Sequence, residues 1–333
     1  MGRWLVAALV AVLALLTLAV PALGLGQADG GAQVIGMRGL LACGCAALAA
    51  LCVLAAARWH ERRGIVRSAA VLAAVLVLVA MVHAGVLASR GLGSGELPTA
   101  ATDRPGDITV LTLNVHSGGD ADAIVVAVQD SGADVLALTE VASWFRDRLE
   151  RRLERAGLDF TMFTGESTGS PGRGSVLFVS DSLGPYVGVP TPYLGVVRVE
   201  AADGVGPPFA VVHPRSLPRV PFVGGSAERM EEWRSDIAVV AQVAAEMPGG
   251  VIAGDINATV DHLPLDDLSG YDDAATIAGI GGYATFPAWL PGSLGATIDH
   301  VLVDTAALTV GSAGILGVPR TDHRAVVVRV AQA

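Results

Sequence analysis

Three long apolar segments dominate the first 89 residues and limit what this part of the chain can become. They run at roughly 4–24, 34–57 and 65–89. Each is long enough to cross a bilayer as a helix, which takes about 20 residues. A helix satisfies all its backbone hydrogen bonds internally, as the bilayer interior requires. We therefore expect three transmembrane helices within residues 1–89, with the lipid bilayer as their partner.

The distribution of arginine predicts how these helices are oriented. The connection 58–67 holds four arginines, whereas the connection 25–33 holds no basic residue. Basic loops stay in the cytoplasm, so the N-terminus and 58–67 are expected there, with the chain after residue 90 outside. The first segment also fits a cleaved signal peptide with Arg3 as its charged start, and cleavage would not change the side on which the rest lies.

The composition changes after the third apolar segment. Residues 90–106 are rich in glycine and proline and are expected to form a flexible linker to a domain at 107–333. Residues 105–333 hold 14 arginines against 28 acidic residues, and the chain has no lysine. Such an acidic domain argues against nucleic acid as a partner. It does not argue against a small phosphorylated substrate that a metal ion helps to hold.

Within this domain, short apolar runs alternate with longer polar or amphipathic segments, a pattern typical of an α/β fold. Strands are expected at 108–115, 135–140, 175–179, 195–199, 209–212, 251–253, 298–303 and 325–330, and helices at 120–129, 146–155 and 226–247.

Many of the expected strands end in polar or titratable side chains. These are Asn114, Glu140, His213, Asp255, Asn257, Asp299, Asp322 and His323. Buried strands that repeatedly finish in such residues indicate one shared cleft at one edge of the sheet. Taken singly, each also has an ordinary explanation: a turn at Gly254-Asp255-Ile256-Asn257, a loop histidine at His213, a surface dipeptide at Asp322-His323.

The order of these motifs resembles the endonuclease/exonuclease/phosphatase superfamily over residues 107–331. The resemblance implies a four-layer α/β sandwich, with two packed β-sheets flanked by helices, preceded by three transmembrane helices. It rests on Leu113-Asn114, Thr139-Glu140, His213, Gly254-Asp255-Ile256-Asn257, Ile298-Asp299-His300 and Thr321-Asp322-His323, where Thr321 replaces the usual serine.

Three spans and an outside domain, together with Thr285-Phe286-Pro287, are similar to a membrane-anchored bacterial branch of the superfamily. That branch includes vancomycin- and teicoplanin-resistance-type proteins, so the resemblance implies a role in antibiotic resistance.

The resemblance implies that Asn114 and Glu140 bind a divalent metal. One carboxylate and one amide oxygen on a largely hydrated ion suit Mg²⁺ or Mn²⁺. Asp322 would add to metal binding or position His323. Asp299 would pair with His323 and fix its tautomer.

The remaining roles concern the attack on phosphorus. Asp255 would orient or deprotonate the attacking water, and Asn257 would hydrogen-bond a phosphoryl oxygen. Protonated His323 and His213 would stabilise the transition state. Whether Asp255 or His323 is the general base stays open at this stage.

Two further groups of residues have two interpretations each. Arg215 and Arg320 lie beside His213 and Asp322 in the sequence, so they would bind a substrate phosphate or be ordinary surface charges. Trp289, with Phe286 and Leu290, would form an apolar lip for a lipid tail or a packed loop, and the packed loop is the preferred interpretation.

The function expected from these observations is a metal-dependent phosphohydrolase at the outer face of the cytoplasmic membrane. It would hydrolyse a phosphoester or pyrophosphate, with a polyprenyl-linked cell-wall precursor phosphate as the candidate substrate. The alternatives are an extracytoplasmic nuclease and a non-catalytic extracellular binding module. The acidic domain argues against the nuclease, and the intact motif set argues against the binding module.

Overall fold

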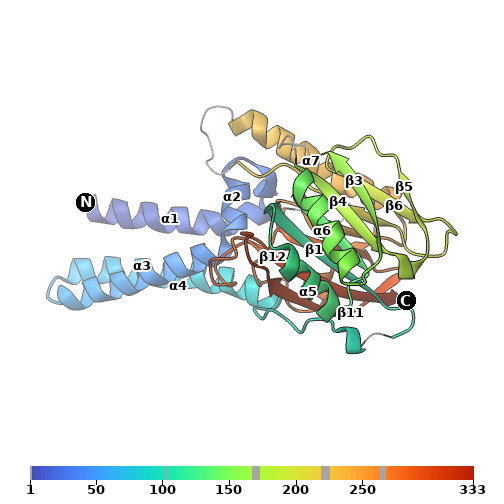
Figure 1. Ribbon diagram of the computed structural model, residues 1–333. Coiled ribbons are helices and arrows are strands. Elements are labelled where there is room, and N and C mark those ends of the chain that lie inside the picture. The colour runs from blue at the N-terminus through green and yellow to red at the C-terminus, as the bar shows by residue number, and fades with distance from the viewer. Residues whose placement is uncertain (1, 103, 167–172, 219–225, 263–267) are drawn as a thin grey trace.

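Long apolar helices project from one side of an α/β domain (Figure 1). The structure is a computed structural model and describes residues 2–102, 104–166, 173–218, 226–262 and 268–333. The helical part holds α1 (Gly2–Ala22), α2 (Gly31–Gly36), α3 (Arg38–Arg58) and α4 (Arg63–Ser89), with a 3-10 turn at Leu25–Gln27.

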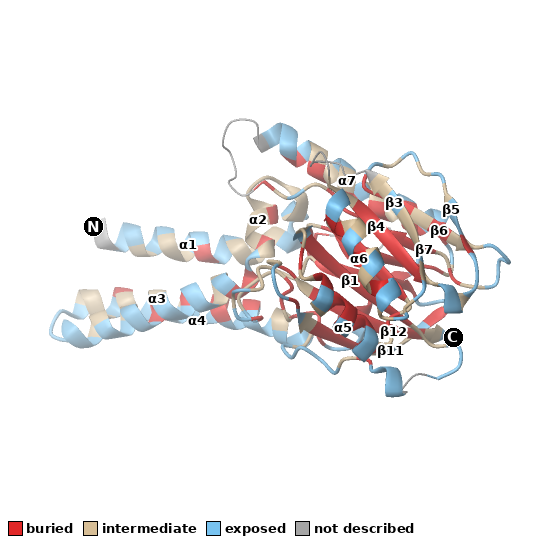
Figure 2. Ribbon diagram, in the orientation of Figure 1, coloured by how far each residue is buried: buried red, intermediate tan, exposed pale blue. Residues whose placement is uncertain are grey.

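Three of these helices, α1, α3 and α4, are long and apolar enough to cross a membrane. Many of their leucine and valine side chains are exposed, and Figure 2 shows long exposed stretches on these helices, as expected for helices that could lie in lipid. They pack on one another through a small cluster that includes Ala14, Ala49 and Ala73, because small side chains let helix backbones approach closely. The segment expected at 34–57 is divided at Met37, since 34–36 belong to α2 and α3 begins at Arg38.

The domain contains two six-stranded sheets. The first holds, from edge to edge, β11 (Leu308–Gly317), β12 (Arg324–Gln332), β1 (Ile108–Ser117), β2 (Val135–Ala142), β4 (Arg173–Ser180) and β3 (Phe160–Glu166). The second holds β5 (Tyr186–Val189), β6 (Val197–Ala201), β7 (Phe209–Val211), β8 (Val251–Asp255), β10 (Asp299–Asp304) and β9 (Tyr271–Asp273).

The two sheets pack face to face over a core rich in valine, to which β1, β8, β10 and β12 all contribute. Helices α5 (Ala121–Ser131) and α6 (Ser143–Arg155) cover the outer face of the first sheet. Helix α7 (Ser226–Glu246) covers the second sheet, and the short α8 (Ala274–Ile277) precedes β10. The predicted four-layer sandwich of two sheets flanked by helices is confirmed.

The connection from α4 to β1 runs along the domain and is held there. The Gly91 carbonyl accepts a hydrogen bond from the Gly282 N–H, and the Ser94 carbonyl accepts one from Ile315. Gly91 has φ +87°, and a Cβ there would collide with the Gly279 carbonyl, so only glycine fits. The start of the segment expected to be a flexible linker is therefore held on the domain, because its backbone pairs with Gly282 and with Ile315 of β11.

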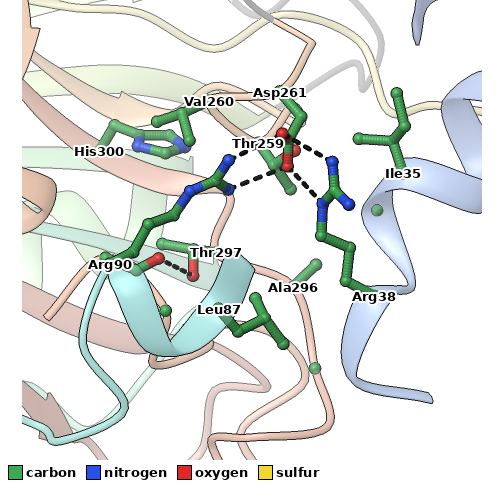
Figure 3. Close-up of a pocket in the computed structure, with 14 residues that line it drawn as sticks. Ile35, Arg38, Leu87, Arg90, Thr259, Val260, Asp261, Ala296, Thr297 and His300 are labelled. Carbon is green, nitrogen blue, oxygen red and sulfur yellow. Dashed lines mark hydrogen bonds and ion pairs between the residues drawn. The ribbon is translucent and has the colours of Figure 1, made fainter. Parts of the chain in front are cut away.

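The α/β domain meets the helices at a charged contact (Figure 3). The Asp261 carboxylate accepts hydrogen bonds from both Arg38, at the start of α3, and Arg90, just after α4, with closest N–O distances of 2.8 and 2.7 Å. These side chains border a cavity of about 20 Å³, which has room for no more than water. One residue further on, His262 Nε2 lies 2.8 Å from the Ala32 carbonyl oxygen in α2.

This contact determines which end of the sandwich faces the helices. Asp261 follows the end of β8 by six residues, and β8 ends at Asp255. Strand β12, which begins at Arg324, starts on the helix side and runs away from it to the C-terminus (Figure 1). The ends of β1, β2 and β8 and the starts of β10 and β12 therefore lie at the edge of the domain nearest the apolar helices.

Candidate active site

Asn114 links one carboxylate from each sheet. Strands β1 and β2 are parallel neighbours with Asn114 opposite Thr139, so their ends deliver Asn114 and Glu140 side by side. The Asn114 Nδ2 donates to Glu140 Oε1 at 3.1 Å and to Asp255 Oδ2 at 2.9 Å, while its Oδ1 accepts the His116 N–H. In this orientation Asn114 holds the two carboxylates together, and its oxygen would reach a metal only after the amide turned over.

Glu140 is held in an unusual backbone conformation. It lies in an irregularity of β2 between Leu138 and Val141 and has φ +52°, a value that costs free energy for a residue with a side chain. Its second oxygen accepts a hydrogen bond from Arg173 Nη1 at 2.8 Å. Burial alone would raise the pKa of Glu140, but the Asn114 hydrogen bond and the charges of His213 and Arg173 lower it, so the carboxylate is ionised at neutral pH.

Asp255 lies at the centre of the group. It is fully buried at the end of β8, and its Oδ1 accepts the Asn257 N–H at 2.9 Å. The Nε2 atoms of His213 and His323 lie 3.7 and 3.9 Å from its Oδ2. Burial raises the pKa of Asp255 above its usual range, although the two histidines oppose this.

His323 is paired with Asp299, as the sequence interpretation requires. The two strands β8 and β10 place Asp299 opposite Asp255, and His323 Nδ1 lies 2.8 Å from Asp299 Oδ2. The Phe286 ring covers the imidazole at 4.8 Å between centroids. Burial would lower the pKa of His323, but the charges of Asp299 and Asp255 outweigh it and raise the pKa to about 10. His323 is therefore an imidazolium at neutral pH.

Two residues that the sequence interpretation did not assign to the site also reach it. His116 Nδ1 lies 3.5 Å from Asp322 Oδ1 and 3.9 Å from Glu140 Oε2. Its position two residues after Asn114 on a strand is the signal that could have identified it, since alternate residues share a face. Arg173 at the start of β4 carries no comparable signal, because only the pairing of β4 with β2 brings it to Glu140.

Three of the expected site residues have other partners. Asn257 donates its Nδ2 to the Pro214 carbonyl at 3.0 Å, so it ties the His213 segment to β8. Arg215 forms an ion pair with Asp236 of α7 at 3.2 Å, and Arg320 is largely exposed and 3.9 Å from Asp120. Among the described residues, both arginines thus pair with acidic residues outside the group around Asp255. Arg173 is the arginine that forms an ion pair with a carboxylate of this group.

The donor atoms fit a divalent cation. Ligand atoms of Glu140, His213 and Asp255 lie within 4.8 Å of one another, as do those of Asp255, Asp299 and His323. The Glu140 side is the better site, because the Glu140 carboxylate is ionised and partly exposed, whereas Asp299 in the second group is already paired with the His323 imidazolium. Asp322 Oδ1 is buried there and accepts no hydrogen bond within the described residues, which leaves an oxygen ligand available.

The domain that contains this cluster of side chains matches a known protein family. Residues 111–323 match the Endonuclease/Exonuclease/phosphatase family. The chain belongs to this family. No curated protein matches it.

Several solved structures are similar to this member of the Endonuclease/Exonuclease/phosphatase family. The human Nocturnin catalytic domain with bound sulfate has 18% identity and a TM-score of 0.49, over 72% of this chain and 97% of that one. A Bacteroides vulgatus endonuclease/exonuclease/phosphatase has 15% identity and a TM-score of 0.49, over 68% and 99%. A humanized D. rerio TDP2 has 16% identity and a TM-score of 0.48, over 68% and 99%.

Members of the Endonuclease/Exonuclease/phosphatase family are hydrolases of phosphodiester bonds, nucleases and phosphatases among them, and typically use a divalent metal. The cluster described above is consistent with that chemistry, because it combines ionised carboxylates, a buried carboxyl of raised pKa and an imidazolium.

Proposed function

We propose that this protein is a metal-dependent phosphohydrolase that acts at the outer face of the cytoplasmic membrane on a lipid-linked phosphate or pyrophosphate. One observation carries the proposal. The edge of the sandwich that holds Glu140, Asp255 and His323 is the edge that faces the membrane helices, and Asp261 fixes it there. A phosphate at the level of lipid headgroups would lie in front of these side chains.

The residues divide the reaction between them. Glu140 and Asp322 would hold Mg²⁺ or Mn²⁺. The Asn114 side-chain oxygen would become a further ligand if its amide group rotated by about 180°. A bound cation would neutralise charge on the phosphoryl oxygens. Asp255 accepts the proton of the attacking water, because burial makes it a stronger base while His323 is already protonated. The proposal thus takes Asp255 rather than His323 as the general base, a choice that the sequence left open.

The other side chains stabilise and position. His323 donates from Nε2 to the phosphoryl group, while Asp299 holds its Nδ1 and the ring orientation. His213 lies on the other side of Asp255 and would donate to a second phosphoryl oxygen. Asn257 and Arg173 support this arrangement, since they fix Asp255 and Glu140 respectively.

Membrane location and charge favour a lipid substrate. An enzyme and a substrate anchored in the same bilayer meet at a raised effective concentration. The acidic domain, with 28 acids against 14 arginines after residue 104, lacks the excess of positive charge that binding to nucleic acid requires. A polyprenyl phosphate of cell-wall synthesis would match the resemblance to the resistance-type membrane-anchored branch.

The proposal is tested with the full chain reconstituted in vesicles. We expect release of phosphate from a polyprenyl pyrophosphate, loss of that activity in EDTA, recovery with Mg²⁺ or Mn²⁺, and no activity in Glu140→Gln. Cleavage of duplex DNA without lipid hydrolysis would replace the proposal by a nuclease. A folded protein that turns over neither substrate would replace it by a binding module.

The proposed orientation has a separate test. In a variant without the native cysteines, Val205→Cys on an exposed turn of the domain should react with a membrane-impermeant maleimide on intact cells. Glu61→Cys, between α3 and α4, should react only after lysis. The reverse pattern would place the domain in the cytoplasm.

A further inference from the structure

The loop 284–297 reaches from the candidate active site to the start of a membrane helix. At one end, Phe286 covers the His323 ring. At the other end, the Ser293 carbonyl lies directly against Gly39 of α3, where a Cβ would collide with it. Between these contacts lies Trp289, which is 76% exposed and is the most exposed large apolar side chain among the described residues.

The loop is held in place without help from the Trp289 side chain. The Arg324 guanidinium donates to the carbonyls of Ala288 and Leu290, on either side of Trp289, at 2.8 and 2.6 Å. The Ala288 N–H donates to the Asp322 carbonyl at 2.7 Å. The backbone is therefore fixed, and it presents an indole to the surroundings. The interpretation of Trp289 as part of a packed loop is wrong, since its neighbours pack and it does not.

An exposed indole in this position fits a membrane interface. Tryptophan gathers at both boundaries of a bilayer, because its ring is apolar while its N–H can reach water or headgroups. Trp4 at the beginning of α1 and Trp59 just after α3 are also exposed. Both lie at the ends of these helices that are farther from the domain and from Trp289. Trp289 stands next to the end at which α3 begins, so tryptophans flank both ends of the apolar region.

We propose that Trp289 inserts into the headgroup–acyl boundary of the outer leaflet and forms a lip beside His323, across which a lipid-anchored phosphate reaches the site. The partner is the bilayer surface, argued from the continuity of the loop with α3. The inference rests on the proposed function and extends it, because it assigns a residue that distinguishes lipid-anchored from water-soluble substrates.

Insertion is tested by fluorescence, which requires no turnover. The full chain with Trp4→Phe and Trp59→Phe is reconstituted in vesicles whose lipids carry brominated acyl chains, which quench nearby tryptophans. We expect Trp289→Phe to remove most of the quenched emission, whereas Trp144→Phe, at the other exposed tryptophan of the domain, leaves it in place. Quenching that persists after Trp289→Phe, or that is lost only with Trp144→Phe, would overturn the inference.

Substrate selection is tested by activity. Trp289→Ser should lower kcat/KM for polyprenyl pyrophosphate in vesicles by about tenfold, the effect of about 1.4 kcal/mol of binding, and leave hydrolysis of a water-soluble phosphodiester unchanged. Val205→Ser, at an equally exposed site on the domain, should change neither. Equal loss on both substrates, or no loss on either, would overturn the lip. If the parent protein hydrolyses neither substrate, the proposed function fails, and the quenching result still decides whether Trp289 inserts.

Discussion

His323→Ala is expected to lower kcat/KM for phosphate release by at least about 100-fold, the usual cost of removing one electrostatic group aimed at a transition state. The imidazolium lies 3.9 Å from Asp255 and is held by Asp299, so its positive charge is fixed where the proposed mechanism places the phosphoryl group. Steady-state assays on the lipid and the water-soluble substrate measure the effect, and it should be similar for both.

Arg320→Ala is the matched control for His323. Arg320 is only three residues away but largely exposed and 3.9 Å from Asp120, so its loss should change activity by less than about twofold. His323→Ala also removes the imidazole that lies beside two buried carboxylates. Its melting temperature must therefore be measured, to show that the variant is folded at the assay temperature. A folded His323→Ala protein that keeps activity within a few-fold of the parent would remove His323 from the mechanism.

Asp261→Ala is expected to destabilise the contact between the domain and the candidate membrane helices by about 3–5 kcal/mol, the cost of removing one partner from a buried ion pair. Arg38 is 7% exposed and Arg90 18%, and both donate to this carboxylate (Figure 3). The expected result is faster proteolysis of the connection after α4. Hydrolysis of the lipid substrate should fall, while hydrolysis of the soluble substrate should not.

The same contact predicts how the junction responds to acid. Burial would raise the pKa of Asp261, but Arg90 and Arg38 outweigh burial and lower it. The stabilisation of the junction is therefore complete above the ordinary aspartate pKa of about 3.9 and is lost as the pH falls through the lower folded-state value.

Asp130→Ala, at an exposed position of α5, is the control for Asp261→Ala. If Asp261→Ala resists proteolysis as well as Asp130→Ala does, the ion pairs do not hold the junction.

Sequence patterns predicted the interior of each sheet better than its edges. The strands β1, β2, β4, β8, β10 and β12 were all expected, because buried strands read as continuous apolar runs. The four edge strands β3, β5, β9 and β11 were missed. An edge strand is only partly buried, as the two exposed residues of β5, Val187 and Gly188, show, and β11 contains three glycines, so neither has a strong apolar run.

The candidate site was predicted where a motif or a strand end carried the residue, and not where packing alone did. The pairing of Asp299 with His323 was implied by the family resemblance, which the short motifs around both residues carry. Arg173 reaches Glu140 only through strand pairing, which no local pattern of residues reports. The partner of Arg215 could not be predicted from the sequence either, because Asp236 becomes its neighbour only when α7 packs on the second sheet.

Asn114 bridges a glutamate of one sheet and an aspartate of the other. The reaction centre therefore exists only while the two halves of the sandwich keep their mutual alignment, and neither half contains it alone. If the proposed reaction takes place here, substitutions of valine side chains deep in the interface should change turnover as well as stability. A slip of one sheet by a fraction of a side chain would separate Asp255, the proposed general base, from Glu140, the proposed metal ligand, while leaving both sheets intact.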